Sequence, residues 1–218
     1  MDHVESIHIV TLSGISKIAI EILSANFLES LLFVYDDNLS LKNSGYTGFN
    51  IVGDLSKLKG IKPRSKYFNG FGNYSVFKKR AELSEQLLNA GLIGHTVIHS
   101  SAVLSPSSII NQGSFIAANV NIGHKCAIGL DCIVFSGTTI EHESEVGSFS
   151  YVSPGVIICG KVKVSKFCYI GPGAIISAGV TIGEKSIIGA GSVILDDVPP
   201  NSIVYGSPGK VIKENNLW

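Results

Sequence analysis

The chain has 218 residues, enough for one large or two modest domains, and 45% of them are hydrophobic, so a buried core is expected and disorder is not. Lysine plus arginine and aspartate plus glutamate both number 17, so no overall charge attracts nucleic acid or an acidic membrane. The first residues lack the pattern of a signal peptide, and no apolar stretch is long enough to span a membrane. We therefore expect a cytoplasmic protein with no membrane or nucleic-acid partner.

The first ninety residues combine strand and helix patterns. Four elements are predicted: strands over 7–12 and 31–36, and helices over 15–25 and 75–90. Their order predicts a small Rossmann-like α/β domain over residues 1–92. In such a domain an anion meets the N-terminus of the first helix, and a carboxylate after the next strand holds a ribose hydroxyl. Asp36 and Asp37 stand at the place of that carboxylate.

The rest of the chain is dominated by a repeat of six residues. From Ile98 to Ile194 every sixth residue is isoleucine, leucine or valine, without interruption, and a mostly small residue stands four places after each. A period of six fits neither an α-helix nor a simple alternating strand, but it suits short strands joined by turns. We therefore predict stacked short strands over residues 93–218. The glycines that often follow the aliphatic residue are expected at corners that need a positive φ or tight packing.

The cysteines follow the same repeat. Three of the four fall in the column of small residues: Cys126, Cys132 and Cys168. None of the four forms a CxxC pair, which argues against a zinc ribbon or a redox motif.

Three segments of the repeat resemble the hexapeptide-repeat acyltransferases: IGHKCAIG, IGPGAIISAGVTIGEKSIIGAGSVI and DVPPNSIVYGSPGKVI. The resemblance implies a mainly β fold, a left-handed parallel β-helix with three hexapeptides in each triangular coil. It also implies a homotrimer with active sites between subunits. The small domain ahead of the repeat narrows the resemblance to the nucleotide-aminosugar N-acetyltransferases of the bacillosamine and perosamine type, with the related sialic acid O-acetyltransferases. That subgroup uses acetyl-coenzyme A, acts on a nucleotide-linked amino sugar and needs no metal.

In this subgroup the first turn of the small domain reads GxSGHG and binds the nucleotide-sugar. The matching segment here, TLSGIS, lacks two of the glycines and has Ile15 in place of the histidine. Gly72 with Asn73 resembles a second loop that faces the substrate. By resemblance, the substrate-binding residues are Ser13, Gly14, Ile15, Asp36, Asp37 and Gly72. The alternative is a packing domain that has lost its ligand.

Acyl transfer from a thioester needs a base for the proton of the acceptor and a donor for the developing oxyanion. Among six histidines, His142 lies two residues past the inward Ile140, so its side chain should project from the wall. The resemblance makes His142 the general base and gives Glu143 the task of orienting it. A neighbouring carboxylate also favours the imidazolium that forms as the proton is taken.

Coil geometry supports the same choice. With three hexapeptides in a coil, residues eighteen apart stack, so His124, His142, Gly160 and Ala178 form one column. Small residues beyond His142 should leave a groove for the thioester, with the N–H of Gly160 donating to its oxygen. His124 is the competing base, but Lys125 beside it would lower its basicity.

The resemblance also assigns residues to the coenzyme slot: Tyr151, Gly160, Pro172, Ala178, Ala190 and Lys210. Tyr151 stands where the subgroup usually has a second histidine, and Phe135 where it often has an asparagine. Both departures predict a changed acceptor pocket or coenzyme contact. Lys210, in the segment GSPGK, is expected to reach a coenzyme phosphate; ordinary coil packing or a solvated lysine is the alternative for these positions.

Three functions remain open. The first is N-acetylation of a nucleotide-linked 4-amino-4,6-dideoxy sugar, and the second is O-acetylation of a sugar hydroxyl. The third is a metal-dependent trimer of the carbonic-anhydrase type or a non-catalytic scaffold. Carbonic anhydrases of this fold need three histidines around zinc, whereas only His124 and His142 lie deep in the repeat.

Overall fold

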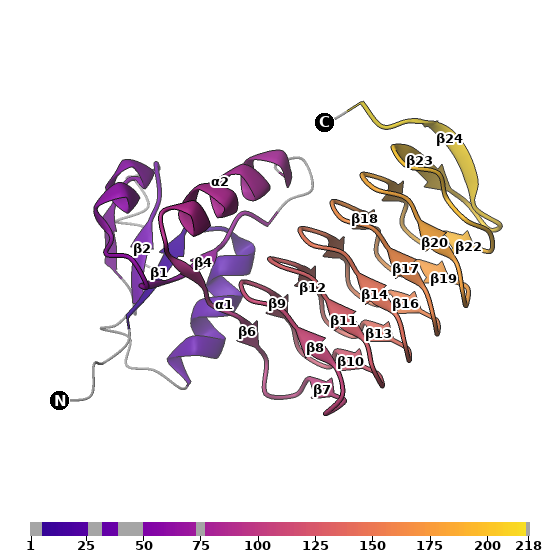
Figure 1. The fold of residues 1–218 in the computed structure, drawn as a ribbon, viewed down its shortest axis with the longest axis horizontal. Helices are drawn as coiled ribbons and strands as arrows, with labels where there is room; N and C mark the ends of the chain where they lie inside the picture. The colour runs from indigo at the N-terminus through magenta and orange to yellow at the C-terminus, as the bar shows by residue number, and fades with distance from the viewer. Residues whose placement is uncertain (1–5, 26–31, 39–49, 73–76, 217–218) are drawn as a thin grey trace. The chain divides into compact units, whose positions relative to one another are not determined.

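A computed structural model describes residues 6–25, 32–38, 50–72 and 77–216 of the chain (Figure 1). The chain divides into two compact units, Met1–Val97 and Ile98–Trp218. Each unit has a hydrophobic cluster of its own.

The N-terminal unit is built on a parallel sheet with the strand order β3-β2-β1-β4-β5. Its strands are β1 (Ile7–Val10), β2 (Leu32–Tyr35), β3 (Asn50–Gly53), β4 (Lys66–Asn69) and β5 (Ile93–Gly94). Its helices are α1 (Gly14–Ser24), the short 3-10 helix η3 (Leu55–Gly60) and α2 (Phe77–Asn89). The strand order reverses on the two sides of β1, as in a doubly wound Rossmann-like unit.

The four elements predicted in this unit are confirmed, with shifts of one to two residues at most ends. β1 and β2 lie inside the predicted strands, and α1 covers the first predicted helix. Residues 31, 75 and 76 of the predicted elements lie outside the described residues. The sequence gives no sign of β3, β4, β5 or η3, because elements of two to six residues are too short to show a period.

The C-terminal unit is a left-handed parallel β-helix, as the resemblance implies, and three sheets form its walls. The first sheet contains β6 (Val97–Ile98), β9 (Phe115–Ile116), β12 (Ile133–Val134), β15 (Tyr151–Val152), β18 (Tyr169–Ile170), β21 (Ile187–Ile188), β23 (Ser202–Tyr205) and β24 (Lys210–Glu214). The second contains β7 (Val103–Leu104), β10 (Asn121–Ile122), β13 (Thr139–Ile140), β16 (Ile157–Ile158), β19 (Ile175–Ile176) and β22 (Val193–Ile194). The third contains β8 (Ile109–Ile110), β11 (Ala127–Ile128), β14 (Glu145–Val146), β17 (Lys163–Val164) and β20 (Thr181–Ile182).

Within the coils, each strand pairs in parallel with the strand one coil away. Partner residues are eighteen positions apart, as Ile122 with Ile140 and Ile140 with Ile158 show. The end of the first sheet departs from this register: β23 pairs in parallel with β21 at a separation of sixteen residues, as Ile187 with Ile203, and β24 folds back antiparallel to β23.

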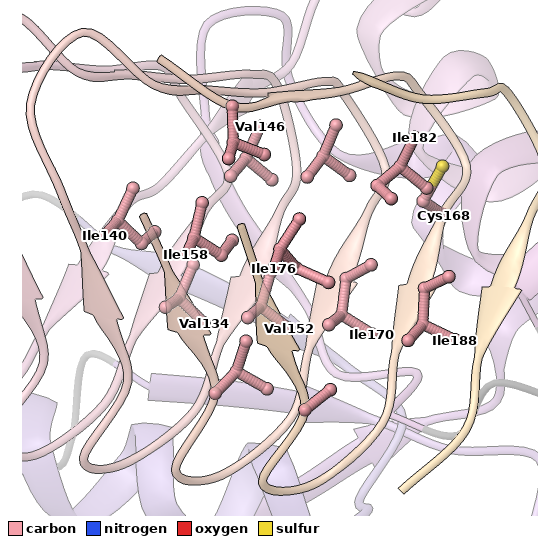
Figure 2. Packing of buried hydrophobic residues seen from close by; sticks show 14 of the residues in the cluster. Val134, Ile140, Val146, Val152, Ile158, Cys168, Ile170, Ile176, Ile182 and Ile188 are labelled. Carbon is pink, nitrogen blue, oxygen red and sulfur yellow. The ribbon is translucent and has the colours of Figure 1, made fainter. Parts of the chain in front are cut away.

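The aliphatic residue of each hexapeptide points into the prism, as predicted. Ile140, Ile158 and Ile176 follow one another along the core of the second sheet and are at most 1% exposed (Figure 2). Ile98, in the first coil, is 38% exposed because nothing stacks on that coil within the helix. The continuous aliphatic core is the main source of stability, since each buried side chain contributes about 1.5–3 kcal/mol.

Side chains in the column of small residues form hydrogen bonds with backbone N–H and C=O groups at the turns. The buried Ser144 hydroxyl donates to the carbonyl of Cys159 at 2.8 Å and accepts the N–H of Val162 at 3.1 Å. The thiol of Cys168 donates at the same offset, to the carbonyl of Gly183 at 3.2 Å. Cysteine therefore takes the place of serine in this column because both are small and carry a donor.

Two different positions of the turn need special residues. The positive φ lies three residues after the aliphatic residue, for example 58° at Glu143 and 62° at Lys161. The glycines directly after the aliphatic residue are needed for packing instead: a Cβ on Gly147 would lie 2.5 Å from the amide nitrogen of Lys166 in the next coil. Of the two reasons considered for these glycines, close packing is therefore correct.

Candidate active site

The second edge of the prism, defined as the turns that lead from the second sheet to the third, carries His142. Its turns include residues 141–144, 159–162 and 177–180. His142, Gly160 and Ala178 take the same place in successive turns, which follows from the eighteen-residue register. The side chain of His142 is 55% exposed and projects from the wall, as its phase in the repeat predicts.

The imidazole of His142 lies directly against the α-carbon of Gly160. A Cβ added to Gly160 would lie 2.5 Å from Nε2 and 2.6 Å from Cε1 of the ring, which is too close for real contacts. Glycine at this position therefore lets the ring approach the backbone of the next coil closely. The column predicted from the repeat arithmetic is a physical contact.

Glu143 places its carboxylate between two positively chargeable groups. Its Oε2 lies 3.8 Å from Nδ1 of His142 and 3.6 Å from Nζ of Lys161, one coil further on. All three side chains are about half exposed or more, so each pair alone is worth at most ~1 kcal/mol. The arrangement nevertheless distinguishes the two ring nitrogens of His142: Nδ1 faces the carboxylate of Glu143, and Nε2 lies beside Gly160. Sequence reasoning missed Lys161, although it stands eighteen residues after Glu143.

On this edge the N–H at the stacked position of each turn has no acceptor among the described residues, as at His142, Gly160 and Ala178. The carbonyls of His124, His142 and Gly160 accept from the residue after the stacked position in the next coil: Glu143 at 2.8 Å, Lys161 at 2.9 Å and Gly179 at 3.0 Å. A base and an unused N–H donor thus lie side by side.

His124, the competing base, has a different environment. Its Nδ1 lies 2.8 Å from the hydroxyl of Ser107, and the same hydroxyl accepts the N–H of Lys125 at 3.0 Å. No carboxylate pairs with His124 among the described residues. The two histidines therefore differ in their neighbours: a carboxylate lies beside Nδ1 of His142, and a serine hydroxyl lies beside Nδ1 of His124.

The remaining residues assigned to the coenzyme lie elsewhere on the β-helix. Tyr151 stands on the first sheet, whereas Pro172 and Ala190 occupy equivalent exposed turns on the first edge, which joins the first sheet to the second. Lys210 opens β24 and is exposed. Within one chain, the predicted coenzyme residues are thus divided between two edges.

The two departures from the subgroup pattern are neighbours in space. The rings of Phe135 and Tyr151 have centroids 5.4 Å apart, and the stack continues to Phe115 at 5.8 Å and to Tyr169 at 5.4 Å. Two aromatic residues therefore stand where the resemblance leads us to expect an asparagine and a histidine. Because the rings of Phe135 and Tyr151 pack together, both changes alter the same part of the surface. Phe135, Tyr151 and Tyr169 form a partly exposed aromatic stripe along the first sheet, and Phe115 at its end is buried.

The N-terminus of α1 is closed by its own side chains. The hydroxyl of Ser13 accepts the N–H groups of Ile15 at 3.1 Å and Ser16 at 3.4 Å, and it donates to the carbonyl of Gly70. The hydroxyl of Ser16 accepts the N–H of Ser13 at 3.2 Å, which completes a capping box. The amide donors that a phosphate would use are therefore largely occupied.

The second predicted loop packs against this cap. Ile15 is 4% exposed, and a Cβ on Gly72 would lie 2.7 Å from its Cγ1. Gly14 is exposed with open space beside it, and Asn73 lies outside the described residues. The isoleucine that replaces the subgroup's histidine is therefore part of the packing between the two loops.

The two aspartates after β2 have separate positions. Asp36 is 8% exposed and accepts the N–H groups of Leu12 and Asn38, each at 2.7 Å. Asp37 is exposed and accepts the N–H of Leu55 at 3.1 Å. Asp36 thus ties the loop after β1 to the loop after β2, which leaves Asp37 the more accessible carboxylate.

A buried arginine fixes the loop after β4, and the sequence gives no signal for it. Arg80 is 1% exposed, and its Nη1 donates to the carbonyls of Asn69 at 2.5 Å and Phe71 at 2.8 Å. The Asn69 amide donates back to the carbonyl of Arg80 at 3.0 Å and to Ser84 at 2.8 Å. This network holds the segment that contacts the α1 cap.

Among the described residues, no group of three or more histidine, cysteine, aspartate or glutamate side chains is arranged to hold a metal ion. None of the helices in the described ranges is long and apolar enough to cross a membrane.

Two family profiles match the repeat. The family described as bacterial transferase hexapeptide (six repeats) matches residues 161–196, and the hexapeptide repeat of succinyl-transferase matches residues 119–154. A search of curated proteins finds no significant match.

Solved structures match nearly the whole chain. PerB from Caulobacter crescentus, crystallised with CoA and GDP-perosamine, is 26% identical, with a TM-score of 0.84 over 96% of this chain and 98% of its own. A variant of the GDP-perosamine N-acetyltransferase from that organism, with a histidine replaced by alanine, is 26% identical, with a TM-score of 0.86 over 97% and 98%. The acetyltransferase domain of PglB from Neisseria gonorrhoeae shares the fold at 24% identity, with a TM-score of 0.86 over 95% and 100%. The similarity covers both units, not the repeat alone.

Proposed function

We propose that this chain acetylates the amino group of a nucleotide-linked 4-amino-4,6-dideoxy sugar, because two hexapeptide-transferase profiles match its repeat and nearly its whole length shares the fold of a perosamine N-acetyltransferase. Acetyl-coenzyme A is the donor, and His142 is the general base. The observation that carries the proposal is the His142 imidazole on Gly160, with Glu143 on its other side. The solved relatives at 26% identity that hold CoA and GDP-perosamine support the choice of substrates.

The geometry suits addition of an amine to a thioester. The neutral amine attacks the carbonyl carbon, a C–N bond forms, and the oxygen becomes an oxyanion that the N–H of Gly160 can stabilise. His142, through Nε2, takes a proton from the nitrogen while Glu143 stabilises the imidazolium near Nδ1. The C–S bond then breaks, and the proton passes to the thiolate of coenzyme A.

We propose that the active site is completed by a second subunit of a homotrimer. Within one chain Gly160 and Ala178 lie on the second edge, and Pro172 and Ala190 lie on the first, so one coenzyme slot needs edges from two copies. The second sheet, which leads to His142, exposes Ile157 by 42% and Ile175 by 37%. Such an apolar strip beside the site favours burial against another subunit.

The acceptor side of this slot is proposed to include the aromatic stripe. Tyr151 and Phe135 offer ring faces rather than hydrogen bonds, which suits the apolar face of a deoxy sugar. Lys210 is proposed to meet a coenzyme phosphate. For the nucleotide we propose contact with Asp37 and with the loops that carry Ser13, Gly14 and Gly72, and a minor role for Asp36 because its oxygens already accept two amides. Since acetyl-coenzyme A and nucleotide sugars are cytoplasmic metabolites, we place the reaction there.

Thiol release from acetyl-coenzyme A tests the proposal. The wild-type chain is assayed with UDP-, dTDP- and GDP-linked 4-amino sugars and with hydroxyl acceptors of the sialic acid type. We expect release only with an amino sugar, and a product whose acetyl group survives hydroxylamine, because amides resist it and esters do not. An ester product would establish O-acetylation instead, and no release with any acceptor would favour a scaffold.

A further inference from the structure

A second candidate site lies in the N-terminal unit, on the side of the sheet that η3 borders. A pocket of about 420 Å³ opens there between β1, β2 and the segment from η3 to β4. Its polar lining consists of Ser6, His8, Tyr35, Lys57, Lys62 and Ser65. This volume falls within the range of small-molecule sites, and no aspartate or glutamate is among the described residues that line the pocket.

The segment that forms one wall is strongly basic. Residues 57–66 contain Lys57, Lys59, Lys62, Arg64 and Lys66 and no acidic residue, although the chain as a whole has zero net charge. Asp54 is the N-cap of η3, and its Oδ1 accepts the N–H of Ser56 at 2.9 Å. Hydrogen bonds from Ser56 and, to a smaller extent, the charge of Lys57 lower the pKa of this carboxyl group. Charge of one sign concentrated beside a pocket attracts anions of the opposite sign.

Two polar rings of neighbouring strands form the floor. Nδ1 of His8 lies 3.1 Å from the hydroxyl of Tyr35, and the His8 ring stacks on Phe33 with centroids 5.5 Å apart. Burial lowers the pKa of His8 and raises the pKa of Tyr35. Both rings are therefore neutral hydrogen-bonding groups at neutral pH when the pocket holds no ligand.

We propose that this pocket binds a phosphate-bearing small molecule, with Lys57 and Lys62 on the phosphate and the pair His8–Tyr35 as hydrogen-bonding floor. The alternative phosphate site in the same unit, the N-terminus of α1, has its donors occupied by Ser13 and Ser16. The pocket offers what that helix end lacks, namely ammonium groups that form no close ion pair among the described residues. The proposal concerns binding alone and does not depend on acetyl transfer.

A bound phosphate would change the protonation of the floor. The titratable groups around His8 are Tyr35 on β2, Lys57 on η3 and Lys62 before β4. An anion beside the imidazole favours its protonated form, so binding should take up a proton and strengthen as the pH falls from 8 to 6. Simple attraction to lysine should instead weaken over that range, because lysine stays charged while the terminal phosphate gains a proton near pH 6.

Isothermal titration of the intact chain with inorganic pyrophosphate and with GDP, at low salt, tests the proposal. We expect Lys57→Gln and Lys62→Gln each to weaken binding about tenfold, since a charge-assisted hydrogen bond is lost. Lys59→Gln, on the same short helix but outside the pocket lining, is the matched control and should bind like wild type. Heats measured in two buffers of different ionisation enthalpy should reveal proton uptake, and His8→Asn should abolish it.

Comparable binding of both probes would identify a polyphosphate anion as the ligand, and tighter binding of GDP a nucleotide. Equal loss in all three lysine variants would mean diffuse surface attraction and would overturn the proposal. So would the absence of binding for both probes at millimolar concentration.

Discussion

Gly160 shows how one residue without a side chain positions another residue's ring. The imidazole of His142 occupies the space where a Cβ would stand, 2.5 Å from Nε2. We expect Gly160→Ala to push the ring off the coil and to lower kcat/KM about 100-fold, because a misplaced base costs about that much. Gly60→Ala, where a Cβ meets nothing within 4 Å and which lies outside the proposed acetyl-transfer site, is the control for the substitution itself. Circular dichroism should show that both variants keep the fold; full activity of Gly160→Ala would contradict the proposed contact.

Glu143 is the second residue whose role the geometry predicts. Glu143→Gln removes the charge that lies 3.8 Å from Nδ1 of His142 and leaves Lys161 without its partner. We expect kcat/KM to fall about tenfold, less than for loss of the base, because a partly exposed carboxylate only assists. Steady-state kinetics on Glu145→Gln, an exposed glutamate two residues further on, provides the comparison. Equal rates for the two variants would remove Glu143 from the site.

Three of the four cysteines are predicted to resist alkylation in the native chain, and Cys159 is the exception. Burial raises the pKa of the Cys168 thiol to about 12 and also raises that of Cys126. Their thiolate populations are therefore negligible at pH 8, and alkylation depends on the thiolate. We expect iodoacetamide to label only Cys159 in the native chain, since it alone is partly exposed, and to label four cysteines in denaturant.

Cys159 also reports on the coenzyme slot, because it precedes Gly160 on the second edge. Coenzyme A should slow its alkylation, which intact-protein mass spectrometry can follow. Fast labelling of Cys168, or a rate at Cys159 that coenzyme A leaves unchanged, would argue against this assignment of buried and open faces.

The elements differ in how far they could be predicted from the sequence. The β-helix is predictable because every hexapeptide repeats one physical demand: an aliphatic residue inward and a small donor at the turn, as Ile140 and Ser144 illustrate. The register of eighteen then places His142 over Gly160. In the N-terminal unit β3, β4 and β5 carry no period, and the cap that Ser13 and Ser16 form depends on side-chain rotamers that no spacing specifies.

The site could be predicted only in part for the same reason. Positions along one edge follow from arithmetic, whereas Lys161 reaches Glu143 through a side-chain conformation, and Arg80 is buried in a helix whose pattern suggests an exposed basic face. Tyr151 and Pro172 lie on a different part of the prism from His142, and this separation follows from the three-sided shape of the coil. A linear motif cannot show on which edge of a subunit each residue stands.

At the scale of the molecule, the proposed trimer depends on the second sheet. We expect light scattering to give three times the chain mass of 23.1 kDa. Ile157→Lys with Ile175→Lys should lower that mass toward a monomer and abolish activity, because buried lysines opposite one another are unpaired charges. Ile109→Lys is the control, since this isoleucine on the third sheet is 61% exposed. A monomeric wild type would contradict a slot shared between two copies.

The central claim is that the second edge performs acyl transfer through His142. Thiol release from acetyl-coenzyme A with the preferred amino sugar should fall 10²- to 10⁴-fold in His142→Ala, the usual contribution of a general base. His124→Ala, one coil earlier in the same column, should stay within about threefold of wild type because its ring is tied to Ser107. An active His142→Ala variant, or an inactive His124→Ala variant with intact fold, would contradict the account.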